Sequence, residues 1–219
     1  MMRMNRHRPS APDRMPREPR VLLLRASMVI SLVLQACWIV GLSGCRQDRQ
    51  ERDGRKAQDE PPAKLTVQSP AFSEGQVIPS RYTADGQDVS PALTWSGLPA
   101  GAKELALVVD DPDAPGSQPW VHWVIYKIPA DATGLPEAVG ALSTLASPAG
   151  ALQGRNSWDT VGYRGPAPPK GDGLHHYRFR LYVLGSCLEL KAGLNRQQLL
   201  EAISGQVVAT GVLVGTYQR

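Results

Sequence analysis

Short segments with strand-like composition, separated by loops rich in Pro and Gly, constrain the fold of this chain most. Residues 120–128 are dense in the β-branched and aromatic types that strands favour. Residues 177–181 alternate apolar and charged side chains, which is typical of a strand with one buried face. Residues 105–109 form a short apolar run, and residues 207–217 are a further strand candidate. The pattern predicts a mainly β domain with long loops.

The strongest helix signal covers residues 196–203. Asn195 can cap the first turn, Gln198 is placed for a capping box, and Gly205 follows the end. In the last strand candidate, Gly211 and Gly215 are expected to mark bulges or close contacts, because glycine leaves room for a neighbour.

The beginning of the chain reads as an export signal. Arginines at positions 14–25 precede an apolar run over residues 26–40, which is the order of a secretory signal, and Met15 is an alternative start. Leu42-Ser43-Gly44-Cys45 closes the run and resembles a bacterial lipobox. We therefore predict that residues 1–44 are a lipoprotein signal peptide and that Cys45 is lipidated. The alternative is a transmembrane anchor with an incidental cysteine, because ~20 apolar residues span a bilayer.

Residues 45–64 are almost entirely charged or polar. Such a segment cannot bury enough apolar surface to offset the entropy lost on ordering, so it is predicted to be a flexible tether. The domain then spans residues 65–219. The expected location is the cell envelope, with the protein held by its lipid at the periplasmic face or in the outer membrane.

The net charge of +4 originates in the leader. Residues 1–44 hold seven Lys/Arg and two Asp/Glu, and the remainder holds 17 positive and 18 negative side chains. A nucleic-acid-binding domain needs its positive charge on the folded part, where it displaces counterions from phosphates. A nearly neutral domain therefore makes nucleic acid an unexpected partner.

Cysteine usage limits how the domain is stabilised. Cys37 lies in the leader and Cys45 would carry lipid, so Cys187 is left without an intramolecular partner. Cys187 stands among leucines and is predicted to be a buried apolar residue. Stability must come from a hydrophobic core.

Two proline-rich segments could hold functional residues rigidly. Asp111 begins an Asp-Pro-Asp-Ala-Pro segment that ends at Pro115, and it is stiff because each proline fixes its own φ. Residues 165–171 form a second loop, Gly-Pro-Ala-Pro-Pro-Lys-Gly. Taken alone, an Asp before Pro is usually a turn initiator and a proline loop is usually only a loop.

Two predicted strands begin with a histidine close to aromatic residues. Trp120 and His122 are expected on one face with Val124 and Tyr126, since strand side chains alternate with period two. Likewise, His175 and Tyr177 should share a side. A histidine on a strand is more often a core or surface residue than a ligand, so the combination matters more than either motif.

The combination resembles the signature of the phosphatidylethanolamine-binding protein family, in its bacterial, Raf kinase inhibitor-like branch. The motifs that carry the resemblance over residues 65–219 follow one another in the family's order: Asp111 to Pro115, Trp120-x-His122, and Pro168-Pro169-Lys170-Gly171-x-Gly173-x-His175-x-Tyr177, with Ile78-Pro79-x-x-Tyr82, Asp88-Val89-Ser90-Pro91 and Thr210-Gly211 to Gly215-Thr216-Tyr217 as similar flanks.

The resemblance implies a Greek-key β-fold in which a large antiparallel sheet packs against a smaller one, with few short helices. It also implies a small pocket for phosphate-like or other anions, without a cofactor or a metal. Carried over residue by residue, the pocket would be lined by Asp111, His122, His175 and Tyr177, with walls shaped by Pro115, Trp120, Gly165 and Pro168. Ala167 replaces a glycine of animal members, which would narrow the rim.

The chemistry of these residue types suits an anion. Histidine and tyrosine can donate hydrogen bonds to it, and protonated histidine adds positive charge. Asp111 would repel an anion, so it is expected to orient a histidine and to raise the pKa of that histidine.

Three classes of function remain open. The favoured one is an exported, lipid-anchored module that binds a small anion or a phosphorylated headgroup. The second is an inhibitor or regulator of a partner enzyme, a peptidase or kinase, acting through the pocket rim. An enzyme is not expected, because the sequence lacks Gly-x-Ser-x-Gly, His-Glu-x-x-His and a phosphate-cradling glycine loop with Lys-Ser/Thr. The physiological ligand, the partner and the oligomeric state are not indicated.

Overall fold

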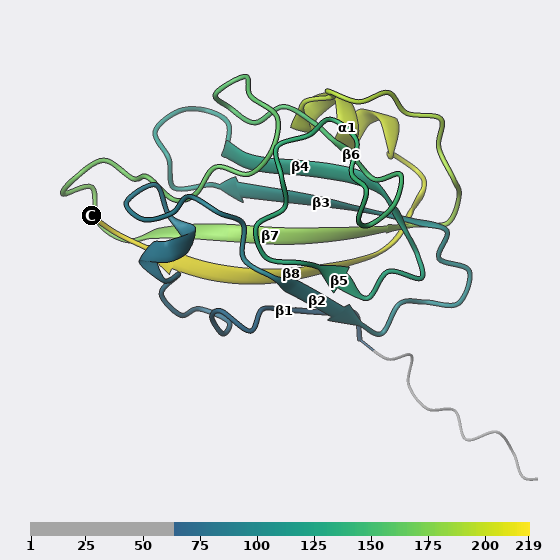
Figure 1. Ribbon diagram of the computed structural model, residues 1–219, viewed down its shortest axis with the longest axis horizontal. Helices are drawn as coiled ribbons and strands as arrows, with labels where there is room; N and C mark the ends of the chain where they lie inside the picture. The colour runs from purple at the N-terminus through teal and green to yellow at the C-terminus, as the bar shows by residue number, and fades with distance from the viewer. Residues whose placement is uncertain (1–63) are drawn as a thin grey trace, which may run out of the picture. The chain divides into compact units, whose positions relative to one another are not determined.

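Residues 64–219, which are the residues that the computed structural model describes, form two antiparallel sheets (Figure 1). The elements in chain order are β1 Thr66–Gln68, the 3₁₀ turn η1 Ser80–Tyr82, β2 Leu93–Ser96, β3 Glu104–Asp111, β4 Trp120–Pro129, β5 Gly134–Leu135, β6 Leu152–Gln153, β7 His175–Leu184, α1 Arg196–Ala202 and β8 Val207–Tyr217. The small sheet has the order β1-β2-β5 and the large sheet β6-β4-β3-β7-β8. The predicted fold class is confirmed, with a large antiparallel sheet, a smaller one and one short α-helix among the described residues.

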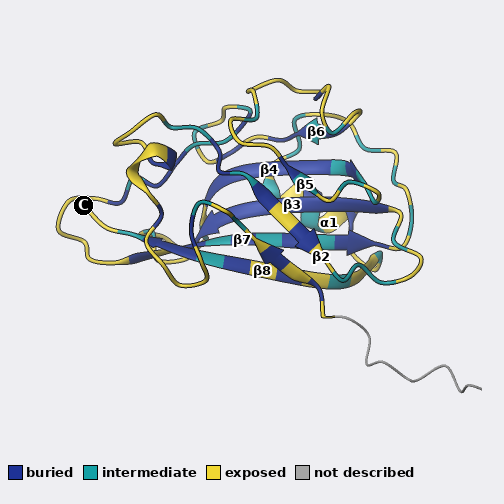
Figure 2. Ribbon diagram, turned by 60° about the horizontal axis from the view of Figure 1, so that its bottom comes forward, coloured by how far each residue is buried: buried dark blue, intermediate teal, exposed yellow. Residues whose placement is uncertain are grey.

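Strand β3 lies in the middle of the large sheet, and its residues 105–109 are apolar on both faces of the strand. All eight of its residues are buried, and it pairs with β4 on one side and β7 on the other. Strand β7 reaches β3 only after the long connection from β4, so the sheet order departs from the chain order (Figure 1). Figure 2 shows these central strands as the most continuously buried part of the domain.

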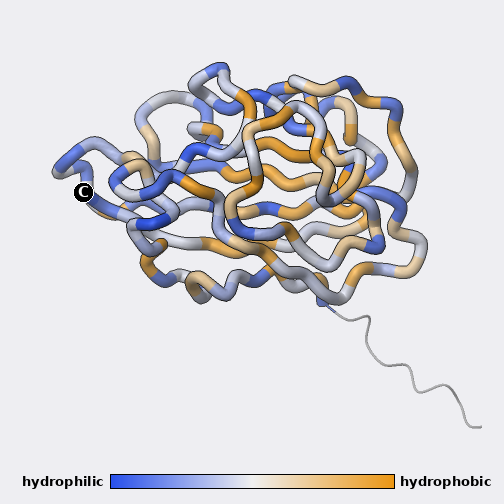
Figure 3. The backbone as a smooth tube through the Cα atoms, in the orientation of Figure 1, coloured by the Kyte–Doolittle hydropathy of each residue, from blue (hydrophilic) through white to orange (hydrophobic). Residues whose placement is uncertain are grey.

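Two hydrophobic clusters cover the two faces of the large sheet. The first lies between the sheets and unites apolar side chains of β1, β2 and β5 with Leu105, Leu107, Val109, Phe179 and Leu181. The second joins Ala106, Val108 and Val124 to Leu199 and Ile203 of the α1 region. In Figure 3 the apolar colours concentrate along the central strands.

Strand β4 does not keep one register along its length. Val109 pairs with Trp123 and Asp110 pairs with Val121, so His122 is an extra residue in the ladder, a β-bulge. The expectation that one face holds Trp120, His122, Val124 and Tyr126 was therefore wrong. Val124 and Tyr126 pack in the second cluster, under the α1 region. His122 is instead turned toward Tyr177, whose ring contacts the first cluster.

The capping box predicted for the helix is confirmed. The Asn195 side chain accepts a hydrogen bond from the backbone N–H of Gln198, and the Gln198 side chain accepts one from the backbone N–H of Asn195. Gly205 follows the helix with φ +77°, a conformation that glycine adopts without strain.

Gly211 and Gly215 mark close contacts and not bulges. Both keep a continuous register with β7, and a Cβ at Gly215 would lie 2.5 Å from Ile78 Cγ1.

Cys187 is exposed, which corrects the prediction that it is buried. It lies in the loop after β7, where Leu188 and Leu190 pack against the second cluster and Cys187 faces solvent.

The predicted signal peptide, the tether as far as residue 63 and Cys45 lie outside the described residues. Within residues 64–219 no helix is long and apolar enough to cross a membrane.

Candidate functional site

A cavity of about 320 Å³ opens at the end of the large sheet where β3 finishes and where β4 and β7 begin. This is also the end that holds the C-terminus in Figure 1. The residues that line the cavity are Asp111, Ala114, Pro115, Trp120, His122, Trp158, Ala167, Pro168, Pro169, His175 and Tyr177. Most of them come from strand ends and proline-rich loops, which hold side chains in fixed directions.

Asp111 is held by the turn that it begins. Its Oδ1 accepts hydrogen bonds from the amides of Asp113 at 2.9 Å and Ala114 at 3.1 Å. This leaves Oδ2 to accept from His175 Nδ1 at 2.8 Å. Asp111 thus orients a histidine, as expected.

The His175 ring is fixed between two carboxylates. Nδ1 meets Asp111, and Nε2 lies 3.2 Å from Asp172 Oδ2 in the loop that precedes β7. Desolvation disfavours the charged ring, yet the hydrogen bonds and negative charges of the two aspartates outweigh it and raise the pKa of His175. A protonated ring then donates from both nitrogens.

His122 has the opposite environment. Its Nδ1 lies 2.7 Å from the Arg164 carbonyl oxygen, and burial lowers the pKa of the ring although the carbonyls of Arg164 and Gly165 and the charge of Asp111 favour its protonated form. The ring packs edge-to-face against Tyr177, with centroids 5.1 Å apart. The bulge in β4 is what turns this side chain toward the cavity end of the sheet.

Tyr177 supplies an unsatisfied donor. Among the buried side-chain atoms of residues 64–219, its hydroxyl oxygen is the one that has no hydrogen-bond partner. Burial, and then the charge and closeness of the Asp111 carboxylate, raise the pKa of Tyr177, so the phenol keeps its proton. Asp111 lies near the hydroxyl, but the two groups do not meet the geometry of a hydrogen bond, since both Asp111 oxygens are engaged by the Asp113 and Ala114 amides and by His175. Buried polar groups are nearly always hydrogen-bonded, and an exception at a cavity wall is typical of a group that binds a ligand.

Aromatic rings form one wall of the cavity. Trp158 lies edge-to-face with both Trp120 and His122, at centroid distances of 5.3 Å and 5.2 Å. The Arg164 guanidinium lies 5.0 Å from the Trp158 ring centroid, as in a cation–π contact. The wall therefore consists of aromatic rings, and the nearby Arg164 is not itself among the residues that line the cavity.

The cavity brings together seven of the eight predicted site residues: Asp111, Pro115, Trp120, His122, Pro168, His175 and Tyr177. Gly165 is not among the lining residues. It permits close approach of another chain segment, since a Cβ there would lie 2.4 Å from the Tyr82 carbonyl oxygen. Its amide donates to Asp88 Oδ1 at 2.6 Å, so Gly165 supports the loop behind the wall.

Sequence reasoning missed Trp158, Asp172 and Arg164. Asp172 lies between two glycines and three residues before His175, a spacing that could have drawn attention to it. Trp158 and Arg164 meet the site only through the fold of the loop between β6 and β7, and no local pattern marks them. In the part of the chain that the structure describes, no group of three or more His, Cys, Asp or Glu side chains is arranged to hold a metal ion.

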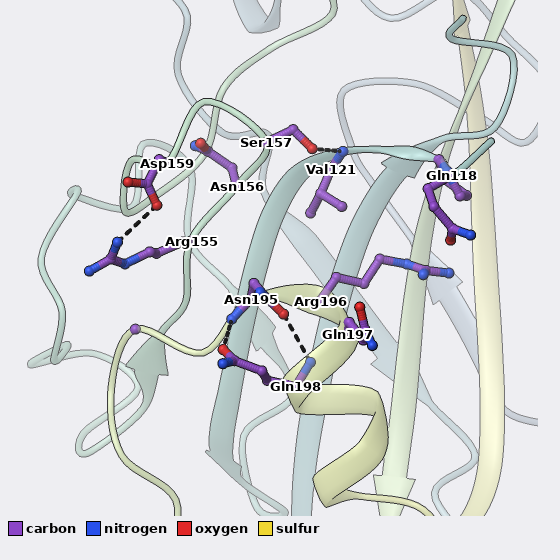
Figure 4. A pocket seen from close by; sticks show the side chains of 12 residues that line it. Gln118, Val121, Arg155, Asn156, Ser157, Asp159, Asn195, Arg196, Gln197 and Gln198 are labelled. Atoms are coloured by element: carbon purple, nitrogen blue, oxygen red, sulfur yellow. Dashed lines mark hydrogen bonds and ion pairs between the residues drawn. The ribbon is translucent and has the colours of Figure 1, made fainter. Parts of the chain in front are cut away.

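A larger hollow of about 630 Å³ lies beside α1 and the loop of residues 155–159 (Figure 4). Its charged side chains are already paired. Arg155 contacts Asp159 at 2.8 Å, and Arg196 contacts Asp110 at 3.1 Å. Its polar groups also bond to one another, as in the Asn195–Gln198 cap. The smaller cavity, which combines unused donors with titratable groups, is therefore the candidate site.

Comparisons with known proteins agree with the fold and the motif order. The model of the phosphatidylethanolamine-binding protein family matches residues 68–218. A UPF0098 protein of Methanothermobacter thermautotrophicus is 48% identical over 155 residues, which cover 71% of this chain and 99% of the relative. A Mycobacterium tuberculosis protein provisionally named lipoprotein LppC is 44% identical over 154 residues, covering 70% and 72% of the two chains.

Solved structures give the same result. A phosphatidylethanolamine-binding protein homologue from Chlamydia trachomatis is 37% identical with a TM-score of 0.64, and Escherichia coli YbcL is 33% identical with a TM-score of 0.67. Each comparison covers 72% of this chain and 99% of the other. With its family match, its two sheets and its ordered Asp, His and Tyr motifs, this chain belongs to the phosphatidylethanolamine-binding protein family.

Proposed function

We propose that this protein is an exported, lipid-anchored module that binds small anions, in particular phosphorylated headgroups. The observation that carries the proposal is the Tyr177 hydroxyl, a buried donor that has no hydrogen-bond partner among residues 64–219 and belongs to a residue lining the cavity. A ligand oxygen at this position would satisfy it. The leader and Cys45 motif support the anchor, as does the lipoprotein name of one relative.

A binding role suits the lining better than a catalytic one. Among residues 64–219, no Ser, Thr or Cys lines the cavity, so the lining lacks the aliphatic hydroxyl and thiol nucleophiles that commonly form covalent intermediates. We expect phosphoethanolamine to bind without release of inorganic phosphate.

The Tyr177→Phe variant tests the proposal, because binding and stability should move in opposite directions. Without ligand the variant should be more stable by about 1 kcal/mol, since an unsatisfied buried hydroxyl is removed. Its affinity for phosphoethanolamine should fall about tenfold or more, since a hydrogen bond to a charged group is worth roughly 1.5–3 kcal/mol.

The measurement is thermal unfolding of the full chain in detergent, with and without phosphoethanolamine. At a hundred times its dissociation constant, the ligand should stabilise the parent by about 2.7 kcal/mol. Leu142→Ala, an exposed position outside the cavity lining, serves as a control that should keep the ligand response. No stabilisation of the parent at any concentration would contradict the proposal.

The second candidate, regulation of a partner enzyme through the pocket rim, is supported by apolar exposure near the mouth. Trp120 is 38% exposed and lines the cavity, and Leu174, just before His175, is 48% exposed. Under this alternative, Leu174→Asp should abolish inhibition of the partner while phosphoethanolamine binding persists.

A further inference from the structure

His122 uses one ring nitrogen for the backbone and leaves the other for a ligand. Nδ1 faces the Arg164 carbonyl at 2.7 Å, and because a carbonyl oxygen only accepts, Nδ1 must carry the hydrogen. Nε2 of the neutral ring is then an acceptor, and no group of residues 64–219 is hydrogen-bonded to it. A phosphate oxygen is an acceptor too, so it can form a hydrogen bond with this nitrogen only if one of the two atoms carries a proton.

The charges around the cavity also favour a ligand that binds together with a proton. Asp111 lines it, and no Lys or Arg is among the lining residues. Three cations lie nearby. Arg164 stands over Trp158 with Asp88 at 3.8 Å, and Arg219 is paired with Asp85 at 2.6 Å. Lys170 follows the lining residue Pro169 but is exposed to solvent and is not itself part of the lining. A doubly charged ligand would therefore find no cation in the cavity lining of residues 64–219 to neutralise its second charge.

The titratable groups around the His122 ring are Asp111 of β3, His175 and Tyr177 of β7, and Asp88 of a loop. Tyr163 lies one step further out, near Tyr177 and Asp88. Both tyrosines stay protonated, since burial raises the pKa of each. His175 is held between Asp111 and Asp172. His122 is thus the group whose protonation can respond most directly to a ligand at Nε2.

Resting on the function proposed above, we propose that the cavity binds a phosphomonoester together with one proton, which bridges a phosphate oxygen and His122 Nε2. Tyr177 donates to a second phosphate oxygen. No covalent bond of the phosphate changes, and when the ligand is a dianion the proton comes from solvent. A phosphodiester is a monoanion that takes up a proton only in strong acid, so it cannot share such a proton at neutral pH and is the disfavoured ligand; a monoester dianion takes up its proton with a pKa of about 6.

Titration calorimetry of the full chain in detergent tests whether a proton binds with the ligand. The two ligands compared are phosphoethanolamine and glycerophosphoethanolamine. Both contain the ethanolamine phosphate group, but the first is a phosphomonoester and the second a phosphodiester. The second pKa of a phosphomonoester is about 6, so at pH 7.5 the free ligand is a dianion. Binding should then take up about one proton, seen by comparing buffers of different ionisation enthalpy, and affinity should fall about tenfold per pH unit above pH 7. The diester should bind about tenfold more weakly at pH 7.5.

The His122→Gln variant locates the proton. Its amide nitrogen can donate without titrating, so the pH slope and the proton uptake should vanish. Should the variant not fold, the nitrogen chemical shift of His122 Nε2 in the parent gives the same information, since it must change to that of a protonated ring when ligand saturates the site at pH 7.5.

The outcomes separate this inference from the proposed function. Phosphoethanolamine that fails to bind anywhere between pH 5.5 and pH 8.5 contradicts the proposed function itself. Binding without proton uptake, equal binding of the diester, or an unchanged slope in His122→Gln overturns only the present inference. Vesicles containing phosphatidic acid, a lipid phosphomonoester, tested against phosphatidylethanolamine vesicles show whether a membrane lipid can supply the ligand.

Discussion

His122 and His175 are both about 2% exposed, yet folding moves the pKa of one down and of the other up. The sequence predicted the partnership of Asp111 with a histidine, because a carboxylate in an anion pocket would otherwise repel the ligand. The turn that Asp111 begins holds this side chain in place. The sequence could not predict which histidine, nor the second carboxylate of Asp172. Both depend on the side-by-side placement of β3 and β7, which are joined by a connection with no regular pattern.

The two histidines give opposite pH dependences of stability. The raised pKa of His175 stabilises the fold fully below about pH 6.5, and this contribution is lost as pH rises through the raised value. The lowered pKa of His122 stabilises the fold above about pH 6.5, and this contribution is lost as pH falls toward the lowered value. Asp85, Asp113 and Glu137, whose pKa values are lowered, change charge below this range.

Urea unfolding between pH 5 and pH 8.5 separates the two effects. The His122→Gln variant should lose stability as pH rises, and the His175→Gln variant should gain it from pH 5 to pH 7. Each slope should reach at most about 1.4 kcal/mol per pH unit, the value for one proton. Slopes of equal sign in the two variants would show that the assigned directions are wrong.

At the scale of elements, sequence pattern found the long strands and missed the short ones. Strands β3, β4, β7 and β8 each contain enough residues to show an apolar run or an alternation. Strands β5 and β6 have two residues each, and no periodicity can appear in so short a segment. The bulge in β4 also escaped prediction, because it depends on register against β3.

Gly215 is where β8 meets a chain segment distant in sequence. An added Cβ would lie 2.5 Å from Ile78 Cγ1 and 2.7 Å from the Phe72 ring, both in the core between the sheets. Gly215→Ala should therefore lower the free energy of unfolding by about 1–3 kcal/mol, the usual cost of overpacking. Gly140→Ala is the matched control, since nothing lies within 4 Å of its added Cβ, and it should change stability by under about 0.5 kcal/mol. If urea unfolding gave equal changes in the free energy of unfolding for the two variants, the core around Gly215 would have to rearrange without cost to accept the added methyl group.

At the scale of the whole molecule, the described domain has no disulfide, and its stability depends mainly on its hydrophobic core. Residues 64–219 contain one cysteine, Cys187, and it is free and exposed. The core between the sheets and the second cluster under α1 bury both faces of the large sheet, so each central strand is covered without a covalent cross-link. Composition predicted this reliance on packing, and motif order predicted the family. The arrangement of the loops that close the cavity required the fold.

Lipid attachment at Cys45 would make the location of the whole protein depend on one sulfur atom. In a bacterial expression host, the parent should be recovered with the membrane fraction and should incorporate labelled palmitate. Cys45→Ser removes the thiol that accepts lipid, so the variant should lose the label. Cys187→Ser is the matched control, because it removes an exposed thiol of the folded domain and leaves the Leu-Ser-Gly-Cys motif intact. It should behave as the parent does. A Cys45→Ser chain that still carries palmitate would contradict lipidation at this residue, and an unlabelled parent held in the membrane would favour a spanning anchor formed by the apolar run before Cys45.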